Sequence, residues 1–167
     1  MNRRVNGVVL LAVWAVFMFF VPAPVRAEEG VAVSRDGTLI AFSVYGEGEP
    51  ALIFVHGWCC NRSVWKNQVP YFEKEYTVVT LDLAGHGASG TERDVYSMES
   101  FGEDVAAVVR QIQASRVILI GHSMSGMVII EAAEMIPDKV LALIGIDTMQ
   151  NFEETYTPEQ REEHLKP

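Results

Sequence analysis

Residues 116–126 decide the fold, and they read Arg-Val-Ile-Leu-Ile-Gly-His-Ser-Met-Ser-Gly. Within them, Val117–Ile120 is a short, continuous apolar run rich in β-branched residues, which is typical of a strand buried on both faces. Over Met124–Ile136 apolar residues recur nearly all round a helix, which suits a helix packed tightly against a sheet, and Pro137 ends it. The segment therefore predicts a buried strand that turns at once into a helix, with Ser123 at the corner.

The corner restricts the backbone conformation of Ser123 and the size of the residues around it. A strand that turns directly into a helix forces the corner residue into a strained backbone conformation. The residues two before and two after the corner crowd each other and must be small; Gly121 and Ser125 are small, and Gly126 relieves the next position. We expect the Ser123 hydroxyl to project at the carboxyl end of the sheet, where N–H groups of the helix N-terminus favour negative charge. Ser123 is therefore a candidate nucleophile, which needs a base to take its proton.

This strand, turn and helix resemble the nucleophile elbow of the α/β-hydrolase family, usually written G-x-S-x-G. The chain departs from that pattern where Ser125 replaces the last glycine, and a hydroxymethyl group is small enough for the turn to survive. A chance Gly/Ser-rich turn is the alternative. Two further segments resemble the family, residues 56–58 (His-Gly-Trp) and residues 82–87 (Asp-Leu-Ala-Gly-His-Gly). Together the three matches cover nearly all of residues 28–151.

The resemblance implies roles for residues around Ser123. In the family's oxyanion loop the residue after His-Gly donates its N–H, so the implied oxyanion donors are the backbone N–H groups of Trp58 and Met124. Asp147 ends the strand that follows the elbow helix. Some members take the triad acid from this strand and most from the next one, so Asp147 is a candidate acid. The alternative is that Asp147 orients a lid or lines the pocket.

The histidines are the candidate general bases. We expect His56 and His122 to support the oxyanion loop and the elbow. His86 is expected to fix its own loop, because in this family the base comes last in chain order, after the nucleophile and the acid. His164 lies in a polar tail from which only a large fold-back would reach the site. The resemblance thus places the catalytic histidine beyond Pro167, so we expect a partial reading frame that hydrolyses substrates very weakly.

Outside the elbow, strands and helices alternate. Strands are expected at Val31–Arg35, Thr38–Tyr45, Ala51–Val55, Tyr76–Leu81 and Lys139–Ile146, with helices holding Val64, Trp65 and Val69 and running from Ser97 to Gln113. This order predicts an α/β fold with a mostly parallel sheet, helices on both faces and an N-terminal antiparallel hairpin at Asp36-Gly37. The resemblance implies the α/β-hydrolase fold, truncated before the lid and the last two strands. The core would be residues 28–151, and residues 152–167, with a helix start at Thr157, would begin the lid or form a tail.

The first 27 residues have the pattern of a signal peptide. Arg3 and Arg4 precede the apolar run Val8–Val21, and residues 25–27 (Val-Arg-Ala) offer small residues for cleavage before Glu28. An uncleaved anchor is the alternative, but the run is short for a bilayer span. We therefore expect an exported protein, periplasmic or extracellular, with no stable membrane anchor after cleavage.

Charge and cysteine content exclude several classes of partner. The chain has 13 basic and 22 acidic residues, and removing residues 1–27 leaves ten basic residues and a net charge of −12. Such a surface argues against nucleic acids and anionic membranes. Cys59 and Cys60 are adjacent, so they cannot form a long-loop disulfide. We expect two thiols near the mouth of the site, and a strained vicinal disulfide is the alternative. No metal-ligand spacing is present, and no metal or cofactor is expected.

These observations predict an exported serine hydrolase that acts on a small-molecule acyl substrate, with an ester-like bond, through an acyl-enzyme. A serine at the elbow resembles the family's esterases, lipases, thioesterases, peptidases and cofactor-free haloperoxidases, and a carboxylesterase or lipase is the expected type. It argues against the epoxide hydrolases and haloalkane dehalogenases, which use an aspartate there. Trp58, Trp65 and Met124 suggest an apolar acyl pocket, although such residues are more often part of the core. The alternatives are a non-catalytic α/β-hydrolase-like binding protein that has lost its base and, less favoured, an acyltransferase.

Overall fold

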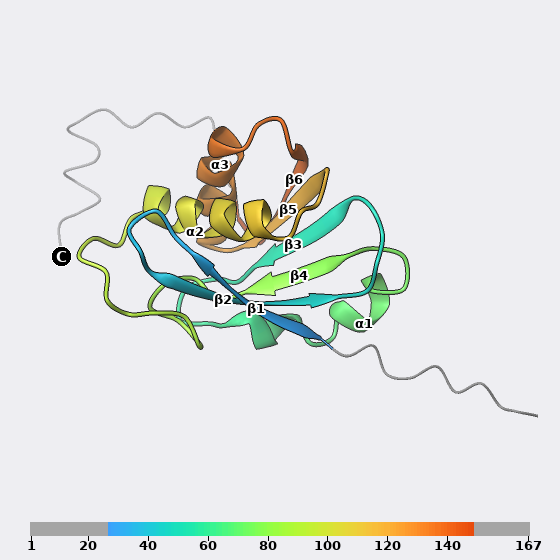
Figure 1. Cartoon of the computed structure of the whole chain (residues 1–167), viewed down its shortest axis with the longest axis horizontal. Helices are drawn as coiled ribbons and strands as arrows, with labels where there is room; N and C mark the ends of the chain where they lie inside the picture. The colour runs from blue at the N-terminus through green and yellow to red at the C-terminus, as the bar shows by residue number, and fades with distance from the viewer. Residues whose placement is uncertain (1–26, 149–167) are drawn as a thin grey trace, which may run out of the picture.

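The computed structural model describes residues 27–148, whose strands form one six-stranded sheet in the order β1-β2-β4-β3-β5-β6 (Figure 1). The strands are β1 (Glu28–Val33), β2 (Leu39–Tyr45), β3 (Ala51–Val55), β4 (Val78–Leu81), β5 (Val117–His122) and β6 (Val140–Ile146). β1 pairs antiparallel with β2 and β2 with β4, whereas β4, β3, β5 and β6 are parallel neighbours. The mostly parallel sheet with an N-terminal hairpin is confirmed.

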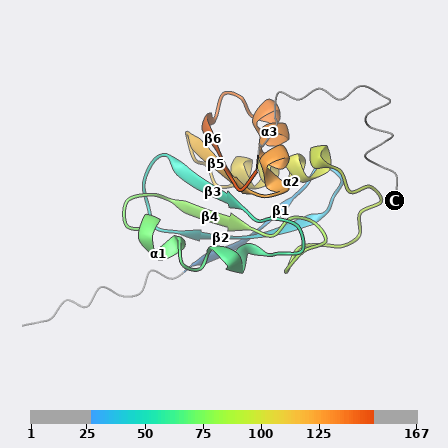
Figure 2. The same ribbon diagram turned by 180° about the vertical axis from the view of Figure 1, so that it is seen from behind.

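Helices cover both faces of the sheet, as predicted. They are η1 (Arg62–Trp65), α1 (Val69–Phe72), α2 (Met98–Gln111) and α3 (Ser125–Met135), where η1 is a 3-10 helix. Figures 1 and 2 show α2 and α3 together on one side of the sheet and α1 on the other. No helix within residues 27–148 is long and apolar enough to cross a membrane. The predicted signal peptide before Ala27, the helix start at Thr157 and His164 lie outside the described residues.

Alternate residues of the central strands build two separate cores. Ile53 and Leu119 face α2 and α3, where they join the larger core. Leu52, Phe54 and Ile120 point the other way and pack with Trp65 and Val69. Side chains on a strand alternate between faces, so the continuous apolar runs of β3 and β5 follow from burial on both sides.

Trp65 belongs to the smaller core and not to a pocket. Its side chain is 5% exposed, and its ring lies 5.0 Å from that of Phe54. Of the three residues that suggested an acyl pocket, Trp65 is therefore a core residue. Met124 is half-buried against the larger core, and Trp58 is 61% exposed.

The helix predicted over Val64 to Val69 is wrong as one element. The chain forms η1 and the single-turn α1 instead, separated by a short turn. The Asn61 side chain accepts the Ser63 N–H and caps η1, and α1 has a proline in its first turn but no side-chain cap. Proline favours a new helix start over continuation of a preceding helix, which explains the break.

Other predicted elements differ from the observed ones by a few residues. The first strand ends at Val33, because the Ser34 N–H donates to the Thr38 carbonyl and closes the turn that holds Asp36 and Gly37. The long helix starts where it was predicted: the Ser97 side chain accepts the Ser100 N–H, and the Ser100 hydroxyl accepts the Ser97 N–H. It ends before Gln113, which has a φ of +56°.

Among residues 27–148, β6 forms the sheet edge beside β5. Four of its apolar side chains are between 37% and 48% exposed, namely Leu141, Leu143, Ile144 and Ile146. An apolar strand thus lies at this edge, next to the elbow strand. The other edge is β1, where Val31 and Val33 are also exposed.

Candidate active site

Ser123 lies at the corner between β5 and α3. Its φ is +53°, a left-handed conformation that residues other than glycine rarely adopt, and its side chain is exposed. The Ser123 N–H donates to the Ile146 carbonyl oxygen at 2.9 Å, and the Ser123 carbonyl accepts the Gly126 N–H at 3.0 Å. The strained corner is thus held on one side by β6 and on the other by the first turn of α3.

Close packing explains why small residues flank the corner. A Cβ atom on Gly121 would lie 2.3 Å from the carbonyl oxygen of Ser125, far inside contact distance. A Cβ atom on Gly126 would lie 2.2 Å from Thr148 Oγ1. The first turn of α3 is therefore wedged between the end of β5 and the residues after β6.

The segment His56-Gly57-Trp58 emerges beside this corner. β3 and β5 are parallel neighbours, with Val55 opposite Gly121, so both strands end at the same edge. A Cβ atom on Gly57 would lie 3.2 Å from Ser123 Cβ and 2.9 Å from His122 Nδ1. Glycine therefore lets the loop lie against the serine without displacing a neighbour. We call residues 56–60 the β3 loop.

Among the backbone N–H groups around Ser123 that have no acceptor within residues 27–148, two are of interest here. They belong to Trp58, in the β3 loop, and to Met124, the N-cap of α3. These are the two donors that the family resemblance implies. An N–H group without a partner at a helix N-terminus is suited to bind an oxygen that carries negative charge.

His56 is held in one ring form inside the protein. It is fully buried, and its Nε2 accepts the Leu83 N–H at 3.1 Å. The proton must therefore be on Nδ1, which donates to the Gly57 carbonyl at 2.8 Å. Burial lowers the pKa of His56 below its usual value of 6.5, so the ring is neutral. Both ring nitrogens are occupied, as expected of a supporting residue.

Asp82 organises the loop after β4. It is buried, and its two carboxylate oxygens accept the Arg62 N–H at 2.7 Å and the Ala88 N–H at 2.9 Å. A Cβ atom on Gly87 would lie 2.2 Å from Asp82 Oδ2, so the loop closes tightly around the carboxylate. Asp82 therefore links this loop to the start of η1, directly after the β3 loop.

His86 packs between the two loops. Its ring centroid is 5.0 Å from that of His56 and 5.6 Å from that of Trp58. Its Nδ1 lies 2.9 Å from the Ala84 carbonyl, to which it donates. This is the arrangement of a loop-fixing residue.

His122 and Asp147 flank Ser123 at the ends of neighbouring strands. The His122 ring makes an edge contact with Trp65, with centroids 6.4 Å apart, on the side of the smaller core. Asp147 directly follows the Ile146–His122 pair, has a φ of +50° and is exposed. Its backbone thus lies beside the nucleophile candidate.

A shallow hollow of about 530 Å³ opens next to the β3 loop. It is lined by Trp58, Cys59, Cys60, Asn61, Gly85, His86, Gly87, Thr91 and Tyr96. Both cysteines are free thiols, and Cys59 is exposed. No group of three or more His, Cys, Asp or Glu side chains within residues 27–148 is arranged to hold a metal ion.

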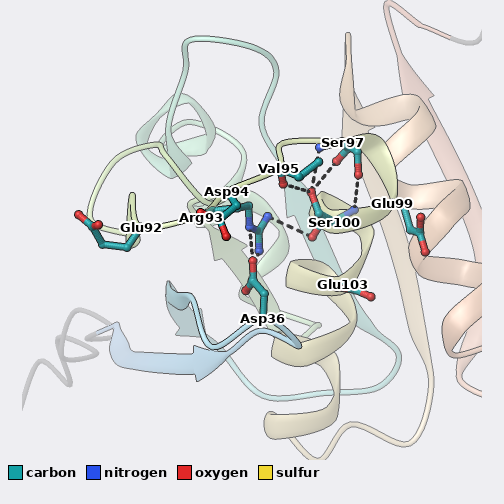
Figure 3. Close-up of a pocket in the computed structure, with 9 residues that line it drawn as sticks. All are labelled: Asp36, Glu92, Arg93, Asp94, Val95, Ser97, Glu99, Ser100 and Glu103. Atoms are coloured by element: carbon teal, nitrogen blue, oxygen red, sulfur yellow. Dashed lines mark hydrogen bonds and ion pairs between the residues drawn. The ribbon is translucent and has the colours of Figure 1, made fainter.

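A separate hollow of about 400 Å³ lies over the N-terminus of α2 and is lined by several acidic side chains (Figure 3). Its floor is Arg93, whose side chain is 1% exposed and donates to Asp36 at 2.6 Å. Arg93 also donates to both carboxylate oxygens of Asp104, at 2.5 and 3.1 Å. The hollow therefore lies over a buried ion pair that links the first hairpin to α2. The charged side chains of this pair stabilise the fold.

Asp36 gives this ion pair a pH dependence. The hydrogen bond from Arg93 lowers the pKa of Asp36 from 3.8 to about 2, so the folded state favours the ionised carboxylate. A lowered pKa contributes stability that is complete above about pH 4 and is lost as the pH falls towards 2. We expect the free-energy difference between wild type and Asp36→Asn, measured by urea unfolding, to shrink over this range. A difference that does not change with pH would contradict this role.

Comparison with known proteins agrees with this geometry. A family model described as the alpha/beta hydrolase fold matches residues 50–165, which include the β3 loop, the Asp82 loop and the elbow. The chain belongs to the α/β-hydrolase family. The predicted fold class is thereby confirmed.

Several members of the family are similar in sequence or structure. The chain is 32% identical to Karrikin insensitive 2 receptor IA of Petunia hybrida over 118 residues, which are 68% of this chain and 43% of the relative. It is 36% identical to 3-oxoadipate enol-lactonase 2 of Acinetobacter baylyi over 87 residues, 52% of this chain and 33% of the relative. A thermophilic esterase from Thermogutta terrifontis superposes with a TM-score of 0.69 and 28% identity, covering 82% of this chain and 50% of that one. This α/β hydrolase thus spans less than half of either curated relative.

Two features of the site have no clear signal in the sequence. One is the Ser125 hydroxyl, which donates to the His56 carbonyl at 2.5 Å. The other is the positive φ of Cys59, at +57°, in the turn closed by the Cys60 N–H and the Gly57 carbonyl. The departure from G-x-S-x-G at position 125 was visible, but its partner lies 69 residues away along the chain.

Proposed function

We propose that this chain is the nucleophile-bearing N-terminal portion of an exported serine hydrolase that cleaves an ester-like acyl bond. One observation carries the proposal: Ser123 is exposed at a strained corner, close to Gly57, and the N–H groups of Trp58 and Met124 have no acceptor within residues 27–148. Nucleophilic acyl transfer needs such a pairing of a hydroxyl with donors for the developing oxyanion. Relatives named as a lactonase and an esterase support an ester-type substrate.

The proposed reaction proceeds in two similar steps. Ser123 Oγ attacks the acyl carbonyl while a general base takes its proton, and the carbonyl oxygen becomes an oxyanion between the N–H groups of Trp58 and Met124. Return of the electrons expels the alcohol, which receives the proton, and leaves an acyl-serine. Water then attacks the acyl-serine in the same way and releases the acid.

The general base is proposed to lie outside residues 27–148. His56 is neutral, buried and hydrogen-bonded through both nitrogens, and His86 donates to the Ala84 carbonyl. The family order of nucleophile, acid and base also places the histidine later in the chain. Asp147 is the candidate acid on the described residues, because it follows the strand paired with β5.

A non-catalytic binding protein is the second candidate function. It is favoured by one observation, that a relative 32% identical to this chain is named as a receptor. Such a protein would keep the pocket without turning over its ligand.

Hydrolysis of p-nitrophenyl esters by the protein expressed from its complete reading frame separates these functions. We expect saturable turnover of acetyl, butyryl or octanoyl esters, with an initial burst of p-nitrophenol where breakdown of the acyl-enzyme is slow. Binding of these esters without turnover would instead favour the receptor-like function.

A further inference from the structure

The Ser125 hydroxyl is an unusual feature of the site. Ser125 is the first residue of α3, its side chain is fully buried, and its Oγ donates to the His56 carbonyl oxygen at 2.5 Å. The usual motif has glycine at this position, which offers no hydroxyl. The bond therefore joins the elbow helix to the β3 loop by a contact that the usual motif lacks.

This bond holds the peptide group between His56 and Gly57. The Ser125 hydroxyl holds the carbonyl of the His56–Gly57 peptide, and the carbonyl of the next peptide accepts from His56 Nδ1 at 2.8 Å and from the Cys60 N–H at 3.2 Å. In a trans peptide the N–H points opposite to the C=O. The held Gly57 carbonyl therefore sets the direction of the Trp58 N–H, and the bond from Ser125 fixes the preceding peptide, from which the Gly57–Trp58 peptide extends.

The β3 loop needs these restraints because it contains Gly57. Gly57 lies so close to the elbow that a Cβ atom there would be 2.9 Å from His122 Nδ1 and 3.2 Å from Ser123 Cβ, so a side chain would have to displace a neighbour. Glycine has the widest backbone freedom of any residue, so the loop needs restraints from outside. The anchor at the other end is rigid, because Ser125 is packed against Gly121 at the end of β5.

We propose that Ser125 is a positioning residue, whose hydroxyl holds the β3 loop so that the Trp58 N–H faces the oxyanion formed at Ser123. This inference rests on the proposed function. Ser125 touches neither the substrate nor the reacting atoms, and it acts through the His56 carbonyl. Because the oxyanion forms only as the transition state is reached, loss of the Ser125 hydroxyl should lower kcat and leave substrate binding nearly unaffected.

The test compares Ser125→Ala and Ser125→Gly with wild type in the full-length protein. We expect kcat to fall about tenfold in both variants, with KM changed less than about twofold. The inhibition constant of a trifluoromethyl ketone, which forms an oxyanion when serine adds to it, should rise in proportion. Ser125→Gly separates the hydroxyl from side-chain volume, because glycine is the usual residue of the motif.

Ser89→Ala is the matched control. The Ser89 hydroxyl is also buried and donates to a backbone carbonyl, that of Asp82, at 2.6 Å; it also accepts the Ala41 N–H at 2.9 Å. Because it removes two hydrogen bonds, we expect Ser89→Ala to lower thermal stability at least as much as Ser125→Ala but to leave kcat and the inhibition constant within about twofold of wild type.

The outcomes distinguish the inference from the function on which it rests. If wild type hydrolyses esters and Ser125→Ala matches Ser89→Ala in kcat and in inhibitor affinity, the positioning role is wrong and the proposed function stands. If wild type shows neither turnover nor inhibitor binding, the proposed function is wrong and the inference falls with it. A selective loss of kcat and inhibitor affinity at position 125 supports both.

Discussion

Replacing Ser123 by alanine is expected to lower kcat for ester hydrolysis by about three to six powers of ten, with KM little changed. The hydroxyl oxygen is the atom that would form the acyl bond, and the two neighbouring N–H groups cannot replace it. Because the side chain is exposed at a corner held by β6 and α3, its loss should not unfold the protein. The measurement is steady-state kinetics on p-nitrophenyl esters, together with circular dichroism to verify the fold.

Ser115→Ala is the control for this experiment. Ser115 is an exposed serine that precedes the opposite end of the same strand, β5, and we expect its replacement to leave kcat within about twofold of wild type. Retention of most of the turnover by Ser123→Ala would mean that another residue carries the reaction.

Replacing Arg93 by methionine is expected to lower the free energy of unfolding by about 3–5 kcal/mol. The substitution keeps most of the side-chain volume but leaves the fully buried Asp104 without its counterion. Burial already raises the pKa of Asp104, while hydrogen bonds from Arg93, Ser34 and Ala84 oppose this effect. Without Arg93 the carboxyl must either protonate or remain charged in an apolar surrounding, and both cost free energy. Urea unfolding measures the change.

A double variant tests whether this cost arises from the unpaired charge. We expect Arg93→Met combined with Asp104→Asn to be more stable than Arg93→Met alone, because the buried charge is then gone. As a control, Arg35→Ala removes an arginine that pairs with Glu103 at 2.8 Å but whose side chain is 79% exposed, and the unfolding midpoint should hardly move. A double variant that loses the sum of two large single effects would contradict this explanation.

Local sequence patterns predicted most of the fold. The run Val117–Ile120 and the glycines around Ser123 specify strand, corner and helix within a few residues, because each constraint acts between near neighbours. The apolar runs of β3 and β5 are equally legible, since burial on both faces removes polar residues from the strand. The region of η1 and α1 was misjudged, because apolar spacing there does not distinguish one helix from two short ones.

The contacts that tune the site were harder to predict. Ser125 and His56 lie 69 residues apart, and Ser34 and Asp104 lie 70 apart, so no local period relates them. A serine or an arginine reads in a sequence as a polar surface residue until the fold places it in the interior. For Trp65 the sequence left open whether the side chain lines a pocket or joins the core. Its packing against Phe54, which lies in β3, places it in the core.

The most direct test of the central claim is to treat the protein from its complete reading frame with a fluorophosphonate and to map the adduct by mass spectrometry. We expect one adduct per chain, on Ser123, and none in Ser123→Ala; the intact mass will also report whether the chain begins at Glu28. An adduct on a different serine, or equal labelling of Ser123→Ala, would contradict the assignment of Ser123 as the nucleophile.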